Sequence, residues 1–258
     1  MVCAAKKIGF LIVVAVVVLS AGCRKSVSVP NDLAVMALNG NVKSVESAMF
    51  AAEDNDGVPE KIAEEPPYMR TVYNFDCSGR CTAVEKFASE TLTAWEERFY
   101  DDSGLSTVKM YSVNYGGDRV VEVEYPDSAS QIWQVFDETG REIAGRKMKL
   151  GREQYNGIGL TASGEPVFYE MMLRRGRVES VKGMFPDHSV LVEYEYDGDG
   201  EMSGYTLRND ADGSKTRTYA ERLDCDEHRN WTKRSLYSVD EDGVYSLQAV
   251  EERTIVYY

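Results

Sequence analysis

The strongest constraint on the fold is a short unit that recurs along the chain. It consists of an aromatic or apolar residue, an aspartate or a substitute for it, two variable residues and a glycine. Clear copies are Phe75–Gly79, Tyr100–Gly104, Phe136–Gly140 and Tyr196–Gly200, and weaker copies end at Gly57, Gly213 and Gly243. Aspartate at the first position of a turn accepts hydrogen bonds from the backbone two residues on, and glycine takes the left-handed conformation that reverses the chain. The unit therefore predicts a series of β-hairpins.

The segments between these turns alternate between apolar and polar residues. In 190–196, one face carries Val190, Val192, Tyr194 and Tyr196, while the other carries Leu191, Glu193 and Glu195. Such alternation is typical of a half-buried antiparallel strand. The expected fold class is all-β, an elongated, twisted antiparallel meander of repeated hairpins. We expect degenerate turn units between 141 and 199, for example Tyr155–Gly157, and one or two helical turns over Asp32–Leu38 with Asp32 as N-cap and Gly40 at the end.

The N-terminus has the pattern of an export signal. Lys6 and Lys7 precede an apolar run, Ile8–Leu19, that is too short to span a bilayer. The run ends in Leu19–Cys23, which resembles the lipobox of bacterial lipoproteins, although Ser20 stands where leucine is more usual. The resemblance implies that Cys23 carries the lipid and becomes the first residue of the mature chain. An ordinary secretory signal with a chance cysteine and an uncleaved anchor are the alternatives.

This interpretation divides the chain into a signal peptide (1–22), a lipidated cysteine with its tether (23–37) and a β domain (38–258). The lipid makes a membrane the first expected partner. Arg24 rather than aspartate follows Cys23, which favours the outer membrane, with the membrane face left open. The formal charge of −14 argues against nucleic acid as a partner, because phosphate backbones are bound by Lys and Arg.

The turn unit, best matched at Tyr196–Gly200, resembles the YD repeat of RHS-type proteins. Three further phrases, Gly40–Val45, Asn230–Arg234 and Glu252–Tyr258, resemble the short RHS-like lipoproteins. The likeness extends over about 38–258, but many copies lack the tyrosine, and Arg229 stands where that family has glycine before Asn-Trp. It implies a long twisted antiparallel sheet without catalysis.

Three cysteines remain in the mature chain besides Cys23, so at least one thiol stays unpaired unless chains cross-link. Cys77 and Cys81 flank an expected hairpin turn and are the candidate disulfide. The turn geometry works against the bond, because a type I turn from Asp76 to Gly79 puts Phe75, not Cys77, opposite Cys81.

Motifs for catalysis, cofactors and metals are weak or absent in the sequence. The chain has two histidines, His188 in an expected turn and His228 in the polar stretch Cys225–His228. No aspartate-rich turn has the ligand spacing of an EF-hand, because Thr206 stands at position 12 of the nearest match, the stretch 195–206. We therefore expect no catalytic residue, no cofactor and no metal.

The aromatic residues are the remaining candidates for ligand contact. Trp95, Trp133 and Trp231 have the chemistry to stack on a sugar or a partner protein, although alternating aromatics on strands more often pack in a core. The sequence thus favours a lipid-anchored envelope protein with a structural role or a protein or glycan ligand, and no enzymatic activity. The alternative is an envelope hydrolase or an accessory protein in carbohydrate processing.

Overall fold

The computed structural model describes most of the chain from residue 32 onward. Within 32–258 it leaves out residues 63–64, 103, 114–116, 152, 162–164, 176, 199, 201 and 241. The described residues form one short helix, α1 (Asp32–Val35), and eighteen strands. The signal peptide, Cys23 and most of the expected tether lie outside the described residues. No helix among the described residues is long and apolar enough to cross a membrane.

The strands follow one another with short connections. Their bounds are β1 (Val42–Phe50), β2 (Ala52–Asn55), β3 (Val58–Lys61), β4 (Met69–Phe75), β5 (Cys81–Ala88), β6 (Thr91–Asp101), β7 (Gly104–Ser112), β8 (Gly117–Asp127), β9 (Ser130–Phe136), β10 (Glu142–Lys149), β11 (Gln154–Leu160), β12 (Pro166–Arg174), β13 (Arg177–Met184), β14 (Ser189–Tyr196), β15 (Met202–Asn209), β16 (Lys215–Cys225), β17 (Trp231–Val239) and β18 (Tyr245–Tyr257).

Sixteen of these strands form one antiparallel sheet in the order β10-β9-β8-β7-β6-β5-β4-β1-β18-β17-β16-β15-β14-β13-β12-β11. Strands β4–β10 and β11–β18 are two meanders in which neighbours in sequence are neighbours in space. The first strand, β1, pairs with the last, β18, and joins the two meanders at the middle of the sheet. The all-β class and the antiparallel hairpin meander predicted from the sequence are confirmed.

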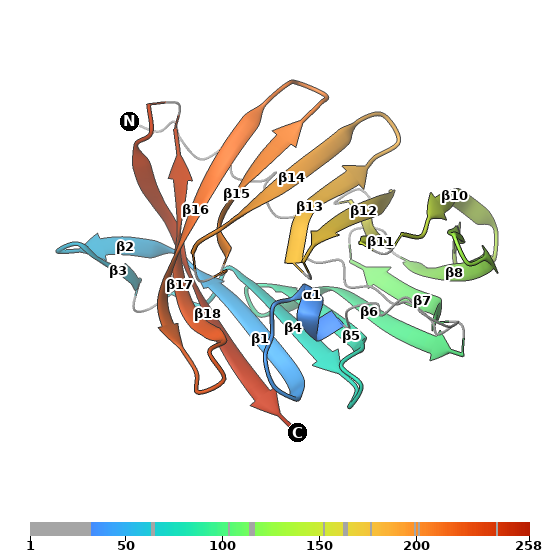
Figure 1. Cartoon of the computed structure of the whole chain (residues 1–258), viewed down its shortest axis with the longest axis horizontal. Coiled ribbons are helices and arrows are strands. Elements are labelled where there is room, and N and C mark those ends of the chain that lie inside the picture. Colours follow the sequence, from blue (N-terminus) through green and yellow to red (C-terminus); the bar gives the residue numbers. More distant parts are fainter. Residues whose placement is uncertain are drawn as a thin grey trace.

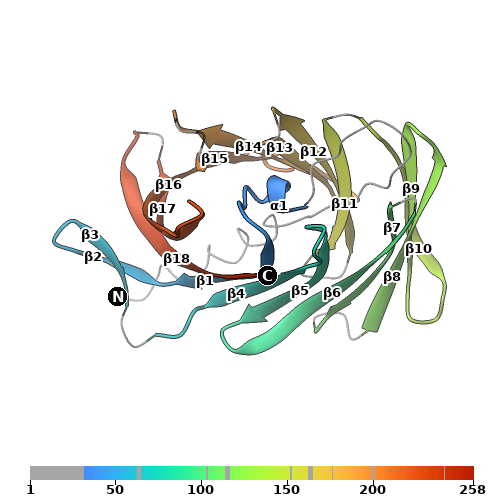
Figure 2. The ribbon, with the colours of Figure 1, turned by 60° about the horizontal axis from the view of Figure 1, so that its bottom comes forward.

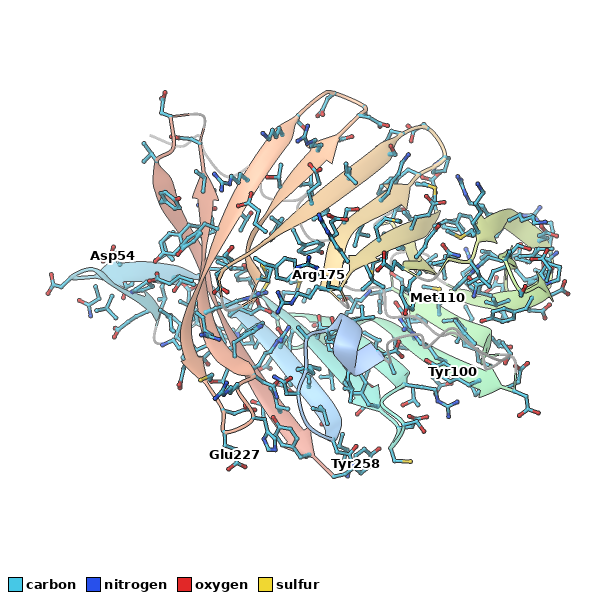
Figure 3. The ribbon with its side chains drawn as sticks, viewed as in Figure 1. Asp54, Tyr100, Met110, Arg175, Glu227 and Tyr258 are labelled. Atoms are coloured by element: carbon cyan, nitrogen blue, oxygen red, sulfur yellow. The ribbon has the colours of Figure 1, made fainter. Side chains whose placement is uncertain are left out.

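Strands β2 and β3 form a separate hairpin that projects from the sheet (Figure 1). Its base is held against β18 and β1, because Lys61 Nζ lies 2.8 Å from Glu252 Oε2 of β18 and 4.5 Å from the ring centroid of Phe50 of β1. Asp54 lies toward the free end of this hairpin (Figure 3).

The predicted turn chemistry is present at the hairpins. Gly57, Gly79, Gly140, Gly200, Gly213 and Gly243 all have positive φ and lie between consecutive strands, and Gly104, also with positive φ, is the first residue of β7. At Asp76 the carboxylate Oδ1 accepts hydrogen bonds from the backbone N–H groups of Ser78 and Arg80, both at 2.9 Å, and the Asp76 carbonyl accepts one from Gly79. Asp137 and Asp240 make the same arrangement in their own turns.

Two turns differ from the sequence prediction. The expected copy at Tyr155–Gly157 is wrong, because these residues lie inside β11. The turn between β16 and β17 is a further copy that the glycine criterion misses. Asp226 accepts hydrogen bonds from the backbone of His228 and Asn230, and Arg229 takes the left-handed position with φ 65°. The turn before Asn230 is therefore of the same kind as the others, with Arg229 in the left-handed conformation that glycine takes elsewhere.

The twisted antiparallel meander is rolled up, so that the two ends of the sheet, β10 and β11, come into contact. Figure 2 shows the strands bent round into a flattened ring. Core residues of β7–β10, such as Val121 and Trp133, pack with Ile158 and Phe168 of β11 and β12. The opposite face of β11 and β12, with Tyr155 and Tyr169, belongs to a second cluster inside the ring. The two ends of the sheet therefore overlap and are held together largely by packing of apolar side chains.

Helix α1 lies inside the ring (Figure 2). Leu33 packs against the cluster from β1, β4 and β5, while Val35 packs against the cluster from β11–β13. The Asp32 carboxylate accepts a hydrogen bond from the backbone N–H of Cys81 at 2.5 Å, so it joins α1 to β5 as well. Residues 32–37, assigned from sequence to the tether, thus belong to the folded body.

The three phrases that resemble RHS-like lipoproteins meet where the first and last strands pair. Asn230 is 2% exposed, its Nδ2 donates to the Asn39 carbonyl at 3.0 Å and to the Tyr257 hydroxyl at 2.7 Å, and its Oδ1 accepts from Asn39 N–H at 2.7 Å. Gly40 has φ 88°, and a Cβ there would lie 3.0 Å from the rings of His228 and Tyr257. Glu227 and Tyr258 lie at this edge of the molecule (Figure 3).

Candidate functional site

The turn between β12 and β13 carries a concentration of positive charge. Arg174 pairs with Arg177 across the hairpin, and Arg175 lies in the connection between them. In a chain with a formal charge of −14, this run of arginines is an exception to the general acidity. Arg175 lies above α1 near the middle of the molecule (Figure 3), and α1 contacts β13.

These arginines line a hollow of about 290 Å³, just below the range of about 300–1,000 Å³ that is usual for small-molecule sites. Its lining residues are Arg174, Arg175, Arg177, Glu179, Tyr194 and Tyr196. Arg174 Nη1 lies 3.2 Å from Glu179 Oε1, so one carboxylate offsets one guanidinium. The hollow therefore has three guanidinium groups as charged hydrogen-bond donors, two tyrosine rings as walls and one carboxylate.

The tyrosines come from β14, whose alternation follows the sequence prediction. Val190 and Val192 are buried on the inner face with Tyr194, while Glu193 and Glu195 form ion pairs with Arg208 and Arg217 outside. The Tyr196 hydroxyl donates to the Val178 carbonyl at 2.7 Å. Burial raises the pKa of Tyr196 to about 12, against the opposing effect of Arg177, so this phenol stays neutral at physiological pH.

The side chain of Arg177 has a defined position against the next hairpin. Its guanidinium carbon lies 5.6 Å from the ring centroid of Tyr196. It also occupies the space above Gly200, where an added Cβ would come within 1.8 Å of Arg177 Nη2. The repeated turn unit at Tyr196–Gly200 therefore does more than reverse the chain, because its glycine leaves room for Arg177.

Two buried ion clusters inside the ring are the other groups of titratable residues. Glu96 lies 2.8 Å from Arg98 Nη2 and 3.4 Å from Lys86 Nζ. Burial alone would raise the pKa of Glu96, but Lys86 and Arg98 together hold it below its ordinary value. A cavity of only about 10 Å³ adjoins Glu96 and Arg98, which is about the space of one water molecule.

The second cluster lies on β17 and β18. The Glu251 carboxylate lies 2.5 Å from Arg234 Nη2 and also accepts a hydrogen bond from the Ser47 hydroxyl. Burial opposes ionisation of Glu251, yet Arg234, Arg253 and Ser47 lower its pKa. In both clusters the carboxylate is engaged by cationic side chains of its own or a neighbouring strand, which indicates a role in stabilising the rolled sheet more than in binding a ligand.

Comparisons with known proteins add little to this geometry. No protein-family model matches the chain, and no curated protein matches it. A crystal structure of a porin-like protein from Bacteroides uniformis aligns with 84% of this chain and 98% of its own, at 10% identity and a TM-score of 0.41. A Tc holotoxin pore structure from Photorhabdus luminescens aligns with 75% of this chain and 15% of its own, at 12% identity and a TM-score of 0.19. At these scores neither likeness bears on function.

The three tryptophans proposed for ligand stacking lie in different places. Trp133 is 1% exposed in the core under β7–β10, so it has no surface to offer a ligand, and that prediction is corrected. Trp231 is half-buried, with the guanidinium carbons of Arg253 and Arg234 at 3.6 Å and 4.0 Å from its ring centroid. Trp95 is half-buried and stacks on Tyr111 across the strand pair, with centroids 6.2 Å apart. Stacking on a ligand stays a prediction for Trp95 and Trp231.

An aromatic cluster that the sequence reading did not single out lies on β16–β18. Tyr219, Tyr237 and Tyr245 have ring centroids 5.4 Å to 6.3 Å apart, and Tyr245 is 53% exposed. The first two are direct partners across the β16–β17 pair. Cross-strand packing of this kind stabilises a sheet, so the cluster has a structural explanation.

Cys77 and Cys81 are free thiols in the structure. Phe75 pairs with Cys81 across the hairpin, as the turn geometry indicates, and Cys77 is exposed in the turn. Cys81 is fully buried, and burial raises the pKa of its thiol to about 12. Cys225 is free and exposed.

The histidines have structural surroundings. His188 lies in a connection between strands and stacks on Phe185 with centroids 4.3 Å apart, and His228 stacks on Tyr257 at 4.1 Å. Within the described part of the chain, no group of three or more His, Cys, Asp and Glu side chains is placed to hold a metal ion.

The arginine hollow is the candidate site, and sequence reasoning missed it. The available signal was the run 174–177, Arg-Arg-Gly-Arg, in an acidic chain. Pairing that run with Tyr194 and Tyr196 required knowledge of how β13 and β14 align.

Proposed function

We propose that this chain is a lipid-anchored protein of the bacterial cell envelope that binds a ligand at the arginine hollow. The observation that carries the binding role is the hollow itself, a space of ligand size between Arg175, Arg177, Tyr194 and Tyr196. Charged donors and aromatic walls are the groups with which proteins orient small polar ligands. A glycan or a protein side chain is the ligand class that the sequence favoured.

The anchor is part of the same proposal. The lipobox-like stretch Leu19–Cys23 supports lipidation at Cys23, and Arg24 supports the outer membrane. Because the folded body begins at Asp32, residues 24–31 would join it to the lipid. Eight residues span at most about 30 Å when fully extended. The body would therefore stay close to the membrane surface.

Membership of the short RHS-like lipoproteins is also proposed. The Asp-opened hairpins in series support it, as does the meeting of Gly40–Val45, Asn230–Arg234 and Glu252–Tyr258 at one edge of the sheet. In that setting the protein would have no catalytic activity of its own.

The alternative, a hydrolase or carbohydrate-processing accessory, requires different chemistry. Glycoside hydrolysis requires two carboxyl groups facing one cleft. The residues lining the hollow include one, Glu179, whose carboxylate is engaged by Arg174. This favours binding over hydrolysis at the hollow.

Two experiments test the proposal. Cys23→Ser should move the protein from the membrane fraction to the soluble fraction, while Cys3→Ser, in the expected signal peptide, should leave it membrane-bound. Retention of the Cys23→Ser protein in the membrane would refute the lipid anchor. For binding, the detergent-purified chain is applied to an array of neutral and acidic oligosaccharides, and bound sugars are then checked by mass spectrometry. Cleaved products would favour the enzymatic alternative.

A further inference from the structure

The arginine hollow keeps an excess of positive charge. Arg174 is paired with Glu179, but Arg175 and Arg177 form no ion pair with any residue that the structure describes. With three guanidinium groups and one carboxylate, the lining carries a formal charge of +2. Among the described residues that line the hollow, Glu179 is the one acidic side chain, and it is engaged by Arg174.

The backbone at Arg175 is costly for the residue that occupies it. Arg175 has φ 55°, in the left-handed region that favours glycine or asparagine. Hairpin connections of this length prefer Asn-Gly or Asp-Gly, and neither would supply a positive charge. The Arg177 side chain lies between Tyr196 and Gly200, so its position is set by the protein's own contacts.

We propose that this hollow binds a phosphate monoester carried on a small sugar or polyol. A phosphate monoester carries a charge of about −1.5 to −2 at neutral pH, which matches the lining, whereas a carboxylate carries −1. Guanidinium groups donate paired hydrogen bonds to phosphate oxygens. The volume of about 290 Å³ limits the ligand to one small ring or a polyol, with Tyr194 and Tyr196 as its walls. The proposal rests on the binding role given above and names its ligand class.

Two sources share this chemistry, a phosphorylated sugar and the head group of a phospholipid. Glucose 6-phosphate represents the first, glycerol 3-phosphate the second, and inorganic phosphate represents the anion alone. Glucose serves as the uncharged control. A preference between the two esters identifies the source, whereas binding of inorganic phosphate alone would overturn the ester.

The experiment is isothermal titration calorimetry on the detergent-purified full chain at low ionic strength. We expect saturable binding of at least one phosphate ester and none of glucose. Arg175→Gln and Arg177→Gln should each weaken binding about 10- to 100-fold, because each removes a charge-assisted hydrogen bond. Arg208→Gln is the matched control, since Arg208 forms a surface ion pair with Glu193 at 3.0 Å and lies outside the hollow. It should bind like the wild-type chain.

The pH dependence provides a second measurement. The second pKa of a phosphate monoester is about 6, so affinity should rise between pH 5 and pH 7.5 as the dianion forms. Equal affinity for glucose and glucose 6-phosphate would overturn the proposal, as would unchanged binding in the Arg175→Gln, Arg177→Gln double variant. If the array shows a neutral glycan whose binding survives that double variant, the phosphate ligand is wrong while the general binding role stands. If no probe and no glycan binds, both are wrong.

Discussion

Replacing Asn230 with alanine tests whether the edge where β1 and β18 meet is held by one amide. The side chain is 2% exposed and makes three hydrogen bonds at 2.7 Å to 3.0 Å with Asn39 and Tyr257. Each such bond contributes about 0.5–1.5 kcal/mol net. Since Asn39 is exposed, its backbone groups can form hydrogen bonds with water in the variant. We therefore expect the free energy of unfolding to fall by about 2–3 kcal/mol in all. For a domain of this size, that lowers the Tm by about 4–12 °C.

The assay is thermal unfolding, followed by far-ultraviolet circular dichroism and by tryptophan fluorescence, because Trp231 adjoins the substituted residue. Asn55→Ala is the control, since Asn55 makes one exposed hydrogen bond to Glu60 at 3.2 Å and should change stability by less than about 0.5 kcal/mol. If Asn230→Ala melts within 1 °C of the Asn55→Ala protein, the amide does not hold this edge and the reasoning fails.

Three further predictions follow from the turns, the ion clusters and the thiols. Arg229→Gly should raise the Tm by about 1–4 °C. The substitution removes about 1–2 kcal/mol of left-handed backbone strain, and about half of this gain is lost because glycine makes the unfolded chain more flexible. A lower Tm in thermal unfolding would contradict this. The pKa of Glu251 is lowered in the folded state. The ionised carboxylate therefore stabilises the fold above the ordinary pKa of glutamate, and this stabilisation is lost as the pH falls. Glu251→Gln should weaken the dependence of Tm on pH below about pH 5, and an unchanged dependence would count against a stabilising role of the Glu251 ion pairs. Ellman's reagent should label Cys77 and Cys225 in the native protein and Cys81 only after denaturation, whereas a Cys77–Cys81 disulfide would leave Cys225 alone to react.

Local turn chemistry made the hairpins predictable from the sequence. Each aspartate–glycine unit contains its own hydrogen-bond acceptor and its own left-handed residue, so the turn at Asp76–Gly79 forms from contacts within five residues. The alternation in β14 was predictable for the same reason, because the pleat alone decides which side chains share a face. The turn at Arg229 was not predictable in this way, because Arg229 has the left-handed backbone conformation that the pattern assigns to glycine.

The rolled sheet and the candidate site depend on contacts between distant residues. Trp133 alternates like any strand aromatic, and only the overlap of β7–β10 with β11 and β12 buries it. Arg175 and Tyr194 meet because the β13–β14 register brings them together, and register follows from the whole packed sheet. The sequence places Asp32 at the start of a helix, but it does not show that the Asp32 carboxylate accepts a hydrogen bond from the backbone of Cys81, 49 residues away.

The pairing of β1 with β18 determines when the protein can finish folding. Both meanders are built from neighbouring strands, whose contacts are local in sequence and quick to form. The pair that joins them brings Val42 opposite Tyr257, so it requires residues far apart in the sequence. On the export route proposed above, β1 would have one edge unpaired until β18 had also crossed the membrane. An exposed edge of this kind invites pairing with other chains, so a chaperone that shields β1 would matter most in that interval.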